Sequence, residues 1–461
     1  MQRKIKENFI FAFTAQAISL VVSCSTNLVL PKILSVSGYS YWQLFLFYCT
    51  YVPCLALGLN DGIYLRYGGI YRNKLDKDGV KSQLVVGMLY QLLLGILVTA
   101  VLIVFSQSAQ RRLLFILVLI YYFFYSGHNF LGFIFQAVNE TNIYSKSIII
   151  VRILFLTAQV LLIAMGMGNV NLYIIFYIIS ISVAFGYLLR KFQPELMSGT
   201  FSFRRGISES WISIRVGISL MLANICSLLI LGICREIIDV RWGLIAFGKI
   251  SFSLTLMNFA LTFIVQISLV LFPALRRLQA DQLRVYYAKL NRALFYLLPV
   301  MYLAYYPLSF LLELWLPKYA ISISYLATVL PICYFDSKMN LIGNTFFKVL
   351  NKQVLLLEIN VITIVVSLTL GLLAAYLFNN MYLVILDMVF AIMFRNVLAD
   401  LLLSSDIGVN ITSSEILDII LALIFILVTN QLGWWQALLI MLGAYLMRVL
   451  IVKSKLLQEF N

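Results

Sequence analysis

Basic side chains inside long apolar runs are the residues of this sequence best suited to bind an anion. Those that lie within such a run, or close one, are Arg66, Arg152, Lys249, Lys338 and Arg395. A charge at membrane depth is costly and usually faces a polar cavity or an opposite charge. The guanidinium of Arg has a planar fork that matches phosphate oxygens, and the ammonium of Lys acts as a point charge. These five side chains are therefore the candidate anion ligands.

Several of these residues also have a structural interpretation. The role of Arg66 could be limited to setting the membrane topology. Arg152 is close enough to the end of its apolar run for its side chain to reach the membrane surface. Arg395 shares its run with Asp387 and Asp400 and could pair with an acid there. Both interpretations stay open at this point.

Acidic residues within apolar runs are candidates for coupling transport to an ion. Asp336 and Asp387 could carry H⁺ or bind Na⁺, and nothing in the sequence decides which ion. Lys338 follows Asp336 closely, but the two do not stack on one helix face. Asp61 is expected to have a local structural role, with pairing to Arg66 as one option.

The sequence contains few residues suited to metal binding, catalysis or nucleic-acid binding. His128 is the single histidine and is expected to be a hydrogen-bonded structural residue, which excludes a His-rich metal site. The six Cys include no CxxC pair, and no nucleophile–base constellation is visible. Basic residues lie in short loops rather than in a nucleic-acid-binding patch. We therefore predict no catalytic residue, no metal, no cofactor and no nucleic-acid partner.

The elements that must position these charges are membrane-spanning helices. Of the 461 residues, 62% are hydrophobic and 11% are charged, which excludes a water-soluble enzyme with one or two anchors. A span takes about 20 residues, and the apolar runs do not alternate with polar residues as barrel strands do. About fourteen helical spans are predicted. They lie at 9–30, 41–64, 83–105, 113–134, 147–168, 172–189, 217–233, 244–272, 294–314, 323–345, 355–378, 382–402, 416–431 and 434–452.

The charge distribution predicts the orientation of this all-α polytopic membrane protein. The chain has 34 Lys and Arg against 19 Asp and Glu, a net charge of +15. When the N-terminus is placed in the cytoplasm, most basic residues fall in cytoplasmic loops and few fall outside. This pattern predicts an even number of spans with both termini cytoplasmic.

Loop lengths predict the domain organisation. The longest polar stretch, Arg190 to Val216, follows the first six runs. We predict an N-terminal lobe of six spans over 1–216, a C-terminal lobe of six spans over 217–403, and a terminal helix pair over 404–461.

Two stretches resemble the Wzx-type oligosaccharide flippases. The matching residues in the first half are Leu30-Pro31-Lys32, Gly38-Tyr39, Trp42 and the run from Leu57 to Tyr67. Those in the second half are Arg235 to Ile238, Gly243, Phe247 and Leu271 to Leu275. This family belongs to a superfamily that also includes multidrug exporters and the lipid II flippase. The sequence departs from the family in its last two runs, because twelve spans are common there.

The resemblance implies that the protein moves an undecaprenyl-pyrophosphate-linked oligosaccharide repeat unit across the plasma membrane by alternating access. It makes Arg66, Arg152, Lys249, Lys338 and Arg395 candidate pyrophosphate ligands. The implied partners are this lipid-linked oligosaccharide, membrane lipids, and a polysaccharide polymerase and glycosyltransferases. One alternative is a cation-coupled small-molecule or multidrug exporter of the same superfamily. A membrane polymerase or ligase is disfavoured because no long outward loop is predicted.

Overall fold

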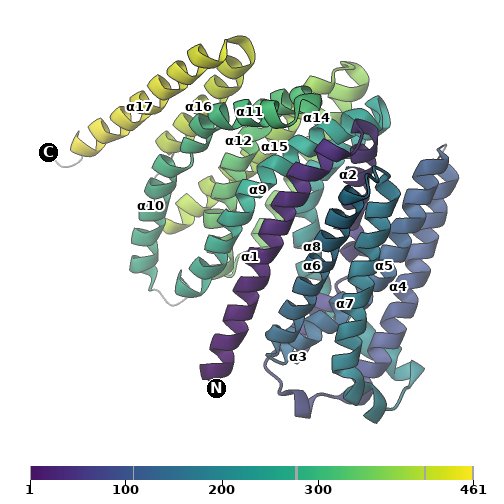
Figure 1. Ribbon diagram of the computed structural model, residues 1–461. Coiled ribbons are helices and arrows are strands. Elements are labelled where there is room, and N and C mark those ends of the chain that lie inside the picture. Colours follow the sequence, from purple (N-terminus) through teal and green to yellow (C-terminus); the bar gives the residue numbers. More distant parts are fainter. Residues whose placement is uncertain (1, 107, 276–278, 410–411, 459–461) are drawn as a thin grey trace. The chain divides into compact units, whose positions relative to one another are not determined.

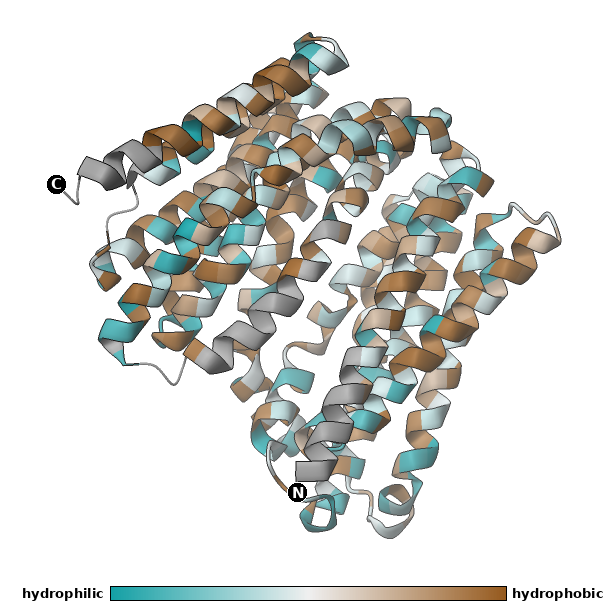
Figure 2. Ribbon diagram, turned by 60° about the vertical axis from the view of Figure 1, so that its left-hand side comes forward, coloured by the Kyte–Doolittle hydropathy of each residue, from teal (hydrophilic) through white to brown (hydrophobic). Residues whose placement is uncertain are grey.

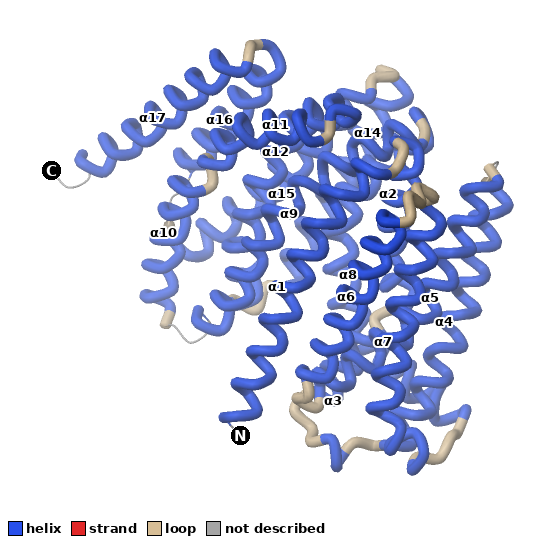
Figure 3. Tube along the Cα trace, in the orientation of Figure 1, coloured by secondary structure: helices blue, strands red, loops and turns tan. Residues whose placement is uncertain are grey.

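Helices form every regular element that the computed structural model describes, over residues 2–106, 108–275, 279–409 and 412–458. Figure 3 shows these helices joined by short loops. Twelve of the described helices are long and apolar enough to cross a membrane. The prediction of an all-α polytopic membrane protein is confirmed.

The chain divides into two compact units, Met1–Ile225 and Cys226–Asn461, and the long helix α8 runs from the first into the second. The elements of unit 1 (Figure 1) are α1 (Gln2–Ile33), α2 (Val36–Tyr51), η1 (Val52–Ala56), α3 (Leu59–Tyr67), η2 (Arg72–Lys74), α4 (Lys77–Phe105), α5 (Ala109–Ala137), α6 (Thr141–Ala164), α7 (Val170–Ser198) and the first part of α8 (Phe203–Trp242). The predicted limits 1–216, 217–403 and 404–461 stay a prediction.

Unit 2 contains the rest of the chain. After the end of α8 its elements are α9 (Leu244–Leu275), α10 (Ala280–Leu297), α11 (Val300–Trp315), η3 (Pro317–Tyr319), α12 (Ala320–Lys338), η4 (Met339–Gly343), α13 (Asn344–Val349), α14 (Gln353–Leu372), η5 (Leu373–Leu377), α15 (Met381–Ile407), α16 (Thr412–Gln431) and α17 (Trp434–Gln458). The π-helical turn η4 joins α12 to α13, so that one apolar segment runs from Pro317 to Val349.

The number of spans is twelve or thirteen among the described residues, where about fourteen were predicted. The thirteenth is a bent pair, Val36–Ala56 with Leu59–Tyr67. The predicted span 244–272 lies within α9, which is one continuous helix from Leu244 to Leu275. The last two predicted spans are present as Ser414–Gln431 and Trp434–Ile451.

The second span is broken at a proline and a glycine. Pro53 lies in the turn η1, and Leu57 and Gly58 then adopt positive φ angles of 51° and 84°. Proline lacks the N–H that an α-helix needs, and glycine accepts a left-handed backbone without strain. The two arms of the span therefore meet at 57°.

Helix α3, the second arm, packs backbone to backbone on α8 within unit 1. A Cβ added to Gly62 would collide with the main chain of Ser213, and one added to Gly217 would collide with the main chain of Gly58 and Gly62. Small residues at a crossing let two membrane helices approach closely. This approach brings the side chain of Arg66, in the last turn of α3, against α8.

Apolar side chains also cover the outward faces of the helices. Only 11% of the most apolar window of α4 is buried, and Figure 2 shows hydrophobic residues in brown along many of the helices. A helix on the surface of a soluble bundle would carry a polar stripe there. These faces fit contact with lipid, and the protein is a multi-pass membrane protein.

Candidate functional site

The guanidinium of Arg66 is held by α8. Its Nη2 lies 2.6 Å from Oε2 of Glu209, and its Nη1 donates hydrogen bonds to the Glu209 carbonyl at 3.0 Å and the Ser213 hydroxyl at 2.7 Å. Gln83 of α4 donates to the same hydroxyl. The expected option of pairing with Asp61 was wrong, because the α3–α8 crossing brings a distant acid closer.

Arg152, in contrast, has no acidic partner among the described residues. It lies half-buried on α6 and forms no ion pair with any residue that the structure describes. Its neighbours include the phenol groups of Tyr121 and Tyr177, whose rings stack 5.7 Å apart. Trp42 and Phe155 stack beside them. Arg152 is thus a cation among aromatic rings with its charge uncompensated by an acid.

Lys249 is the corresponding case in unit 2. It lies half-buried on α9, and within the described part of the chain its ammonium forms no ion pair. An unpaired ammonium within a span needs water or an anion beside it. Arg152 and Lys249 are therefore the two predicted ligands whose charge is available.

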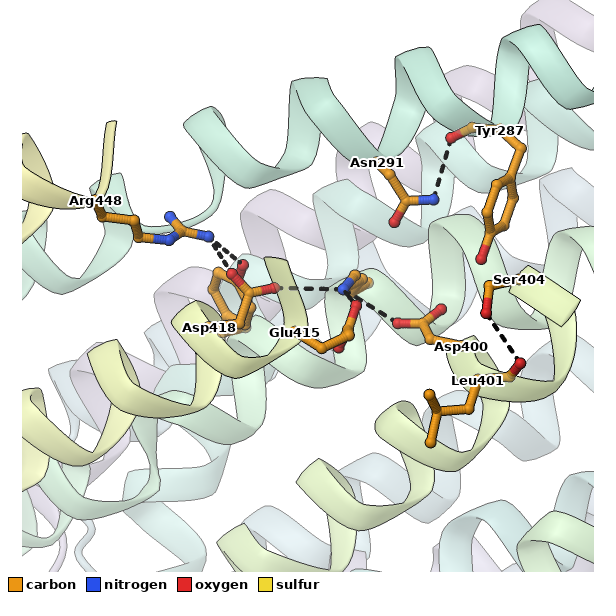
Figure 4. A network of polar contacts seen from close by, with 10 residues as sticks. Tyr287, Asn291, Asp400, Leu401, Ser404, Glu415, Asp418 and Arg448 are labelled. Carbon is orange, nitrogen blue, oxygen red and sulfur yellow. Dashed lines mark hydrogen bonds and ion pairs between the residues drawn. The ribbon is translucent and has the colours of Figure 1, made fainter. Parts of the chain in front are cut away.

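Lys338 is already saturated with acids. Its Nζ lies 3.1 Å from Asp400 and 3.3 Å from Asp418, and it also pairs with Glu415. Figure 4 shows the three carboxylates pointing toward one another from α15 and α16. A pyrophosphate would have to displace these acids to reach Lys338.

Arg395 pairs with an acid of another helix rather than of its own. Its Nη1 lies 3.3 Å from Oδ1 of Asp336 on α12, and its Nε donates to Asn360 at 2.8 Å. The two acids that share its helix, Asp387 and Asp400, have other partners. The option of pairing with an acid on its own helix was wrong: the partner is Asp336 of α12, which was predicted as an ion-coupling residue.

Asp387 lies where α8, α14 and α15 of unit 2 meet. Its Oδ2 accepts a hydrogen bond from the Cys234 thiol at 3.2 Å and from the Ser367 hydroxyl at 3.3 Å. Its Oδ1 is buried without a hydrogen-bond partner. Gly371 allows this approach, because a Cβ there would lie 3.2 Å from Oδ2. A buried carboxylate with hydroxyl and thiol neighbours but no base can take up a proton or a monovalent cation.

Several functional neighbours could not be read from the sequence. Glu415 and Asp418 form ion pairs within unit 2, and Arg448 of α17 is only 3% exposed and pairs with Asp418. The spacing of Glu415 and Asp418 does place both acids on one face of a helix. It does not indicate which other helix that face contacts. His128 lies 2.9 Å from the Ser147 hydroxyl in the core of unit 1, as expected for a structural residue.

A cavity of about 210 Å³ lies apart from these charges. It is bordered in unit 1 by α2, η1, α4 and α5, and its lining is mostly apolar with aromatic residues such as Tyr51, Phe115 and Tyr122. None of the predicted site residues lines it. The cavity therefore does not locate an anion site.

Comparisons with known proteins identify the fold. No family model matches the sequence, and no curated protein matches it. An inward-facing multidrug resistance MATE family transporter of the MOP superfamily is 13% identical over 87% of this chain and 98% of its own, with a TM-score of 0.65. The lipid II flippase MurJ, in an inward closed conformation, is 12% identical over 98% of this chain and 99% of its own, with a TM-score of 0.62.

A third structure has a different binding site on a similar fold. A MOP superfamily transporter from Pyrococcus furiosus Vc1, described as having a binding pocket of reverse polarity, is 12% identical over 88% of this chain and 95% of its own, with a TM-score of 0.53. At these identities the likeness concerns the fold and not the substrate. The chain has the fold of the MOP-superfamily transporters, which MATE transporters and the lipid II flippase MurJ share.

Proposed function

We propose that the protein flips an undecaprenyl-pyrophosphate-linked oligosaccharide repeat unit from the cytoplasmic to the outer leaflet of the plasma membrane. The observation that carries the proposal is Arg152, a half-buried intramembrane cation without an acidic partner among the described residues. A guanidinium in this setting is suited to the bidentate binding of a phosphate. Lys249 adds a second available charge in unit 2.

The extent of the structural likeness supports a lipid-linked substrate. MurJ matches 98% of this chain, whereas the MATE transporter matches 87%. MurJ is a flippase for lipid II, and a full-length likeness leaves little of this chain outside its fold. A long lipid tail could remain in the bilayer while only the headgroup passes through the protein.

Energy coupling is proposed at Asp387. Its carboxylate is buried beside Cys234 and Ser367, and no base in the described part of the chain pairs with it. Binding of H⁺ or Na⁺ there would change the charge at the meeting point of three helices. Asp336 is the weaker candidate because Arg395 neutralises it.

The decisive experiment is deletion of the gene in a host that makes the polysaccharide. We expect the lipid-linked repeat unit to accumulate on the cytoplasmic leaflet, where a glycosidase added to the periplasmic side cannot reach it. We also expect the surface polymer to disappear. A polymerase and glycosyltransferases acting on the same repeat unit are the expected partners. Normal export in the deletion strain would refute the proposal.

A small-molecule or multidrug exporter is the second candidate. The likeness to a MATE transporter and the unpaired carboxylate of Asp387 favour it. Such an exporter would lower the accumulation of cationic dyes in cells and leave the repeat unit's distribution unchanged. Measuring both quantities in the same deletion strain separates the two functions.

A further inference from the structure

Unit 2 contains a second group of titratable side chains, distinct from the surroundings of Asp387. We name it the buried charge cluster; its members are Lys338 of α12, Asp400 of α15, Glu415 and Asp418 of α16, and Arg448 of α17. No member has a side chain more than 4% exposed. The terminal helix pair α16–α17 thus meets α12 and α15 through charges shielded from water (Figure 4).

The cluster holds one more acid than base. Arg448 pairs with Asp418, donates to the Phe295 carbonyl at 2.7 Å and to the Tyr334 hydroxyl at 3.2 Å, and lies 3.5 Å from the centre of the Phe295 ring. Asp418 therefore has its own base. Asp400 and Glu415 are left with the single ammonium of Lys338 between them. A net negative charge that is buried in this way is strongly disfavoured.

Unsatisfied polar atoms surround this same pair of acids. Oδ1 of Asp400 and Oε2 of Glu415 are buried and lack a hydrogen-bond partner. The hydroxyl of Tyr287, on α10, is also buried without a partner, and Figure 4 shows it pointing toward Asp400 and Ser404. A carboxylate oxygen accepts hydrogen bonds, so each of these two acids has one oxygen that lacks a hydrogen-bond donor. One proton would supply that donor.

A proton fits the site better than a metal ion. Among the described residues, no group of three or more His, Cys, Asp or Glu side chains is arranged to hold a metal. One bound proton brings the formal charge of the cluster to zero, since three acids then balance two bases and the proton. The neighbouring charged pair, Arg395 with Asp336, already balances itself.

We propose that Asp400 and Glu415 share one bound proton, and that this proton fastens the helix pair α16–α17 to α12 and α15. Lys338 of α12 pairs with both acids, the hydroxyl of Tyr287 of α10 points toward Asp400, and Asp418 of α16 shares the Lys338 ammonium and pairs with Arg448 of α17. Glu358 of α14 is exposed and does not face this pair of acids. This proton site requires neither the proposed substrate nor the proposed coupling at Asp387.

Loss of the proton weakens one end of the attachment. The other end of the helix pair is held by neutral contacts: the Tyr306 hydroxyl lies 2.9 Å from that of Thr429, and Trp434 donates to the Tyr306 carbonyl at 2.9 Å. These contacts do not titrate near neutral pH. Deprotonation therefore loosens the charged end of α16 and leaves the other end attached.

The test measures thermal unfolding of the full-length protein in lipid nanodiscs from mildly acidic to mildly alkaline pH. In the unfolded chain both acids ionise near their ordinary pKa of about 4, so the folded state binds one proton more. Stability must then fall as pH rises, by up to about tenfold in the folding equilibrium per pH unit. Asp400→Asn, which needs no proton, is expected to reduce this dependence by the contribution of the one shared proton.

Glu415→Gln is the second variant, and it is expected to reduce the pH dependence of stability in the same way. Asp406→Asn is the matched control. Asp406 lies near the end of α15 and pairs with Lys352 at the surface, so its replacement should keep the wild-type dependence. Hydrogen exchange of α16, corrected for the intrinsic effect of pH, should increase at alkaline pH in the wild type and in Asp406→Asn, but not in Asp400→Asn or Glu415→Gln.

Three results would overturn the proposal. The first is a wild-type unfolding temperature that does not fall with rising pH, which can be read even if both variants fail to fold. The second is a pH dependence of stability that is as steep in Asp400→Asn and Glu415→Gln as in the wild type. The third is stabilisation by Na⁺ over choline at fixed pH that Asp400→Asn abolishes, which would assign the site to a metal ion.

Discussion

At the scale of single residues, the partners of a charge decide whether it is available to a substrate. Lys338 and Arg395 are enclosed by acids, and Arg66 is bound to Glu209, whereas Arg152 and Lys249 form no ion pair with a described residue. Enclosed charges hold helices together because breaking a buried pair leaves the other charge unpaired. Available charges are those that can meet an anion.

Replacing Arg152 by Ala should slow flipping by about ten- to a hundredfold, because a hydrogen bond to a charged group contributes about 1.5–3 kcal/mol. Arg152→Lys should recover part of the rate, since it restores the charge without the fork. The measurement is the rate at which a lipid-linked repeat unit crosses proteoliposome membranes. Lys289→Ala, which removes an exposed basic residue of α10, is the control and should leave the rate unchanged. A wild-type rate for Arg152→Ala would remove this residue from the site.

Replacing Asp387 by Asn should abolish the response of transport to an imposed ion gradient. The amide keeps the size of the side chain and its place beside Cys234 and Ser367, but it can neither bind a proton nor neutralise a cation. Flipping by proteoliposomes is measured with H⁺ and Na⁺ gradients applied separately, which also identifies the ion. Asp406→Asn should respond as the wild type does. An unaltered response of Asp387→Asn would move coupling elsewhere.

At the scale of helices, the crossing of α3 and α8 depends on the absence of side chains. The main chains approach so closely that no Cβ fits at Gly62, which lies against the Ser213 main chain, or at Gly217. The crossing also places Glu209 beside Arg66. The sequence showed the spacing of Gly58 and Gly62, but the helix that would fill the groove could not be inferred from it.

Gly62→Ala should therefore lower the unfolding temperature of the purified protein by several degrees, since its methyl group would overlap the Ser213 main chain and force the helices apart. Gly186→Ala is the matched control, because no atom lies within 4 Å of a Cβ at that position on α7. That variant should be neutral or slightly stabilising, because Ala favours a helix more than Gly does. Equal unfolding temperatures of the two variants would argue against a tight crossing.

At the scale of the whole molecule, the predicted orientation places both termini in the cytoplasm. Cysteine labelling in a variant without the six native cysteines checks it. Met167→Cys, in the exposed loop after α6, should react with a membrane-impermeant maleimide in intact cells, and Ser405→Cys, near the end of α15, should react only after lysis. Labelling of residue 405 from outside would overturn the orientation, because it places that end of α15 on the opposite face.

The sequence by itself determined the membrane-spanning helices and the candidate charges within them. In lipid every backbone polar group must be satisfied within its own segment, so each span appears as one long apolar run. Even the weak runs at 416–431 and 434–452 correspond to α16 and α17. The predicted span at 244–272 likewise lies within α9.

Tertiary structure alone decided which charges pair. Arg66 meets Glu209, Arg395 meets Asp336, and Lys338 meets three acids from two other helices. These partners are far apart along the chain, and helical periodicity specifies which face a residue lies on but not which helix that face meets. The pairing depends on crossings and breaks such as the one at Leu57 and Gly58, and it is the pairing that separates structural charges from those free to bind a substrate.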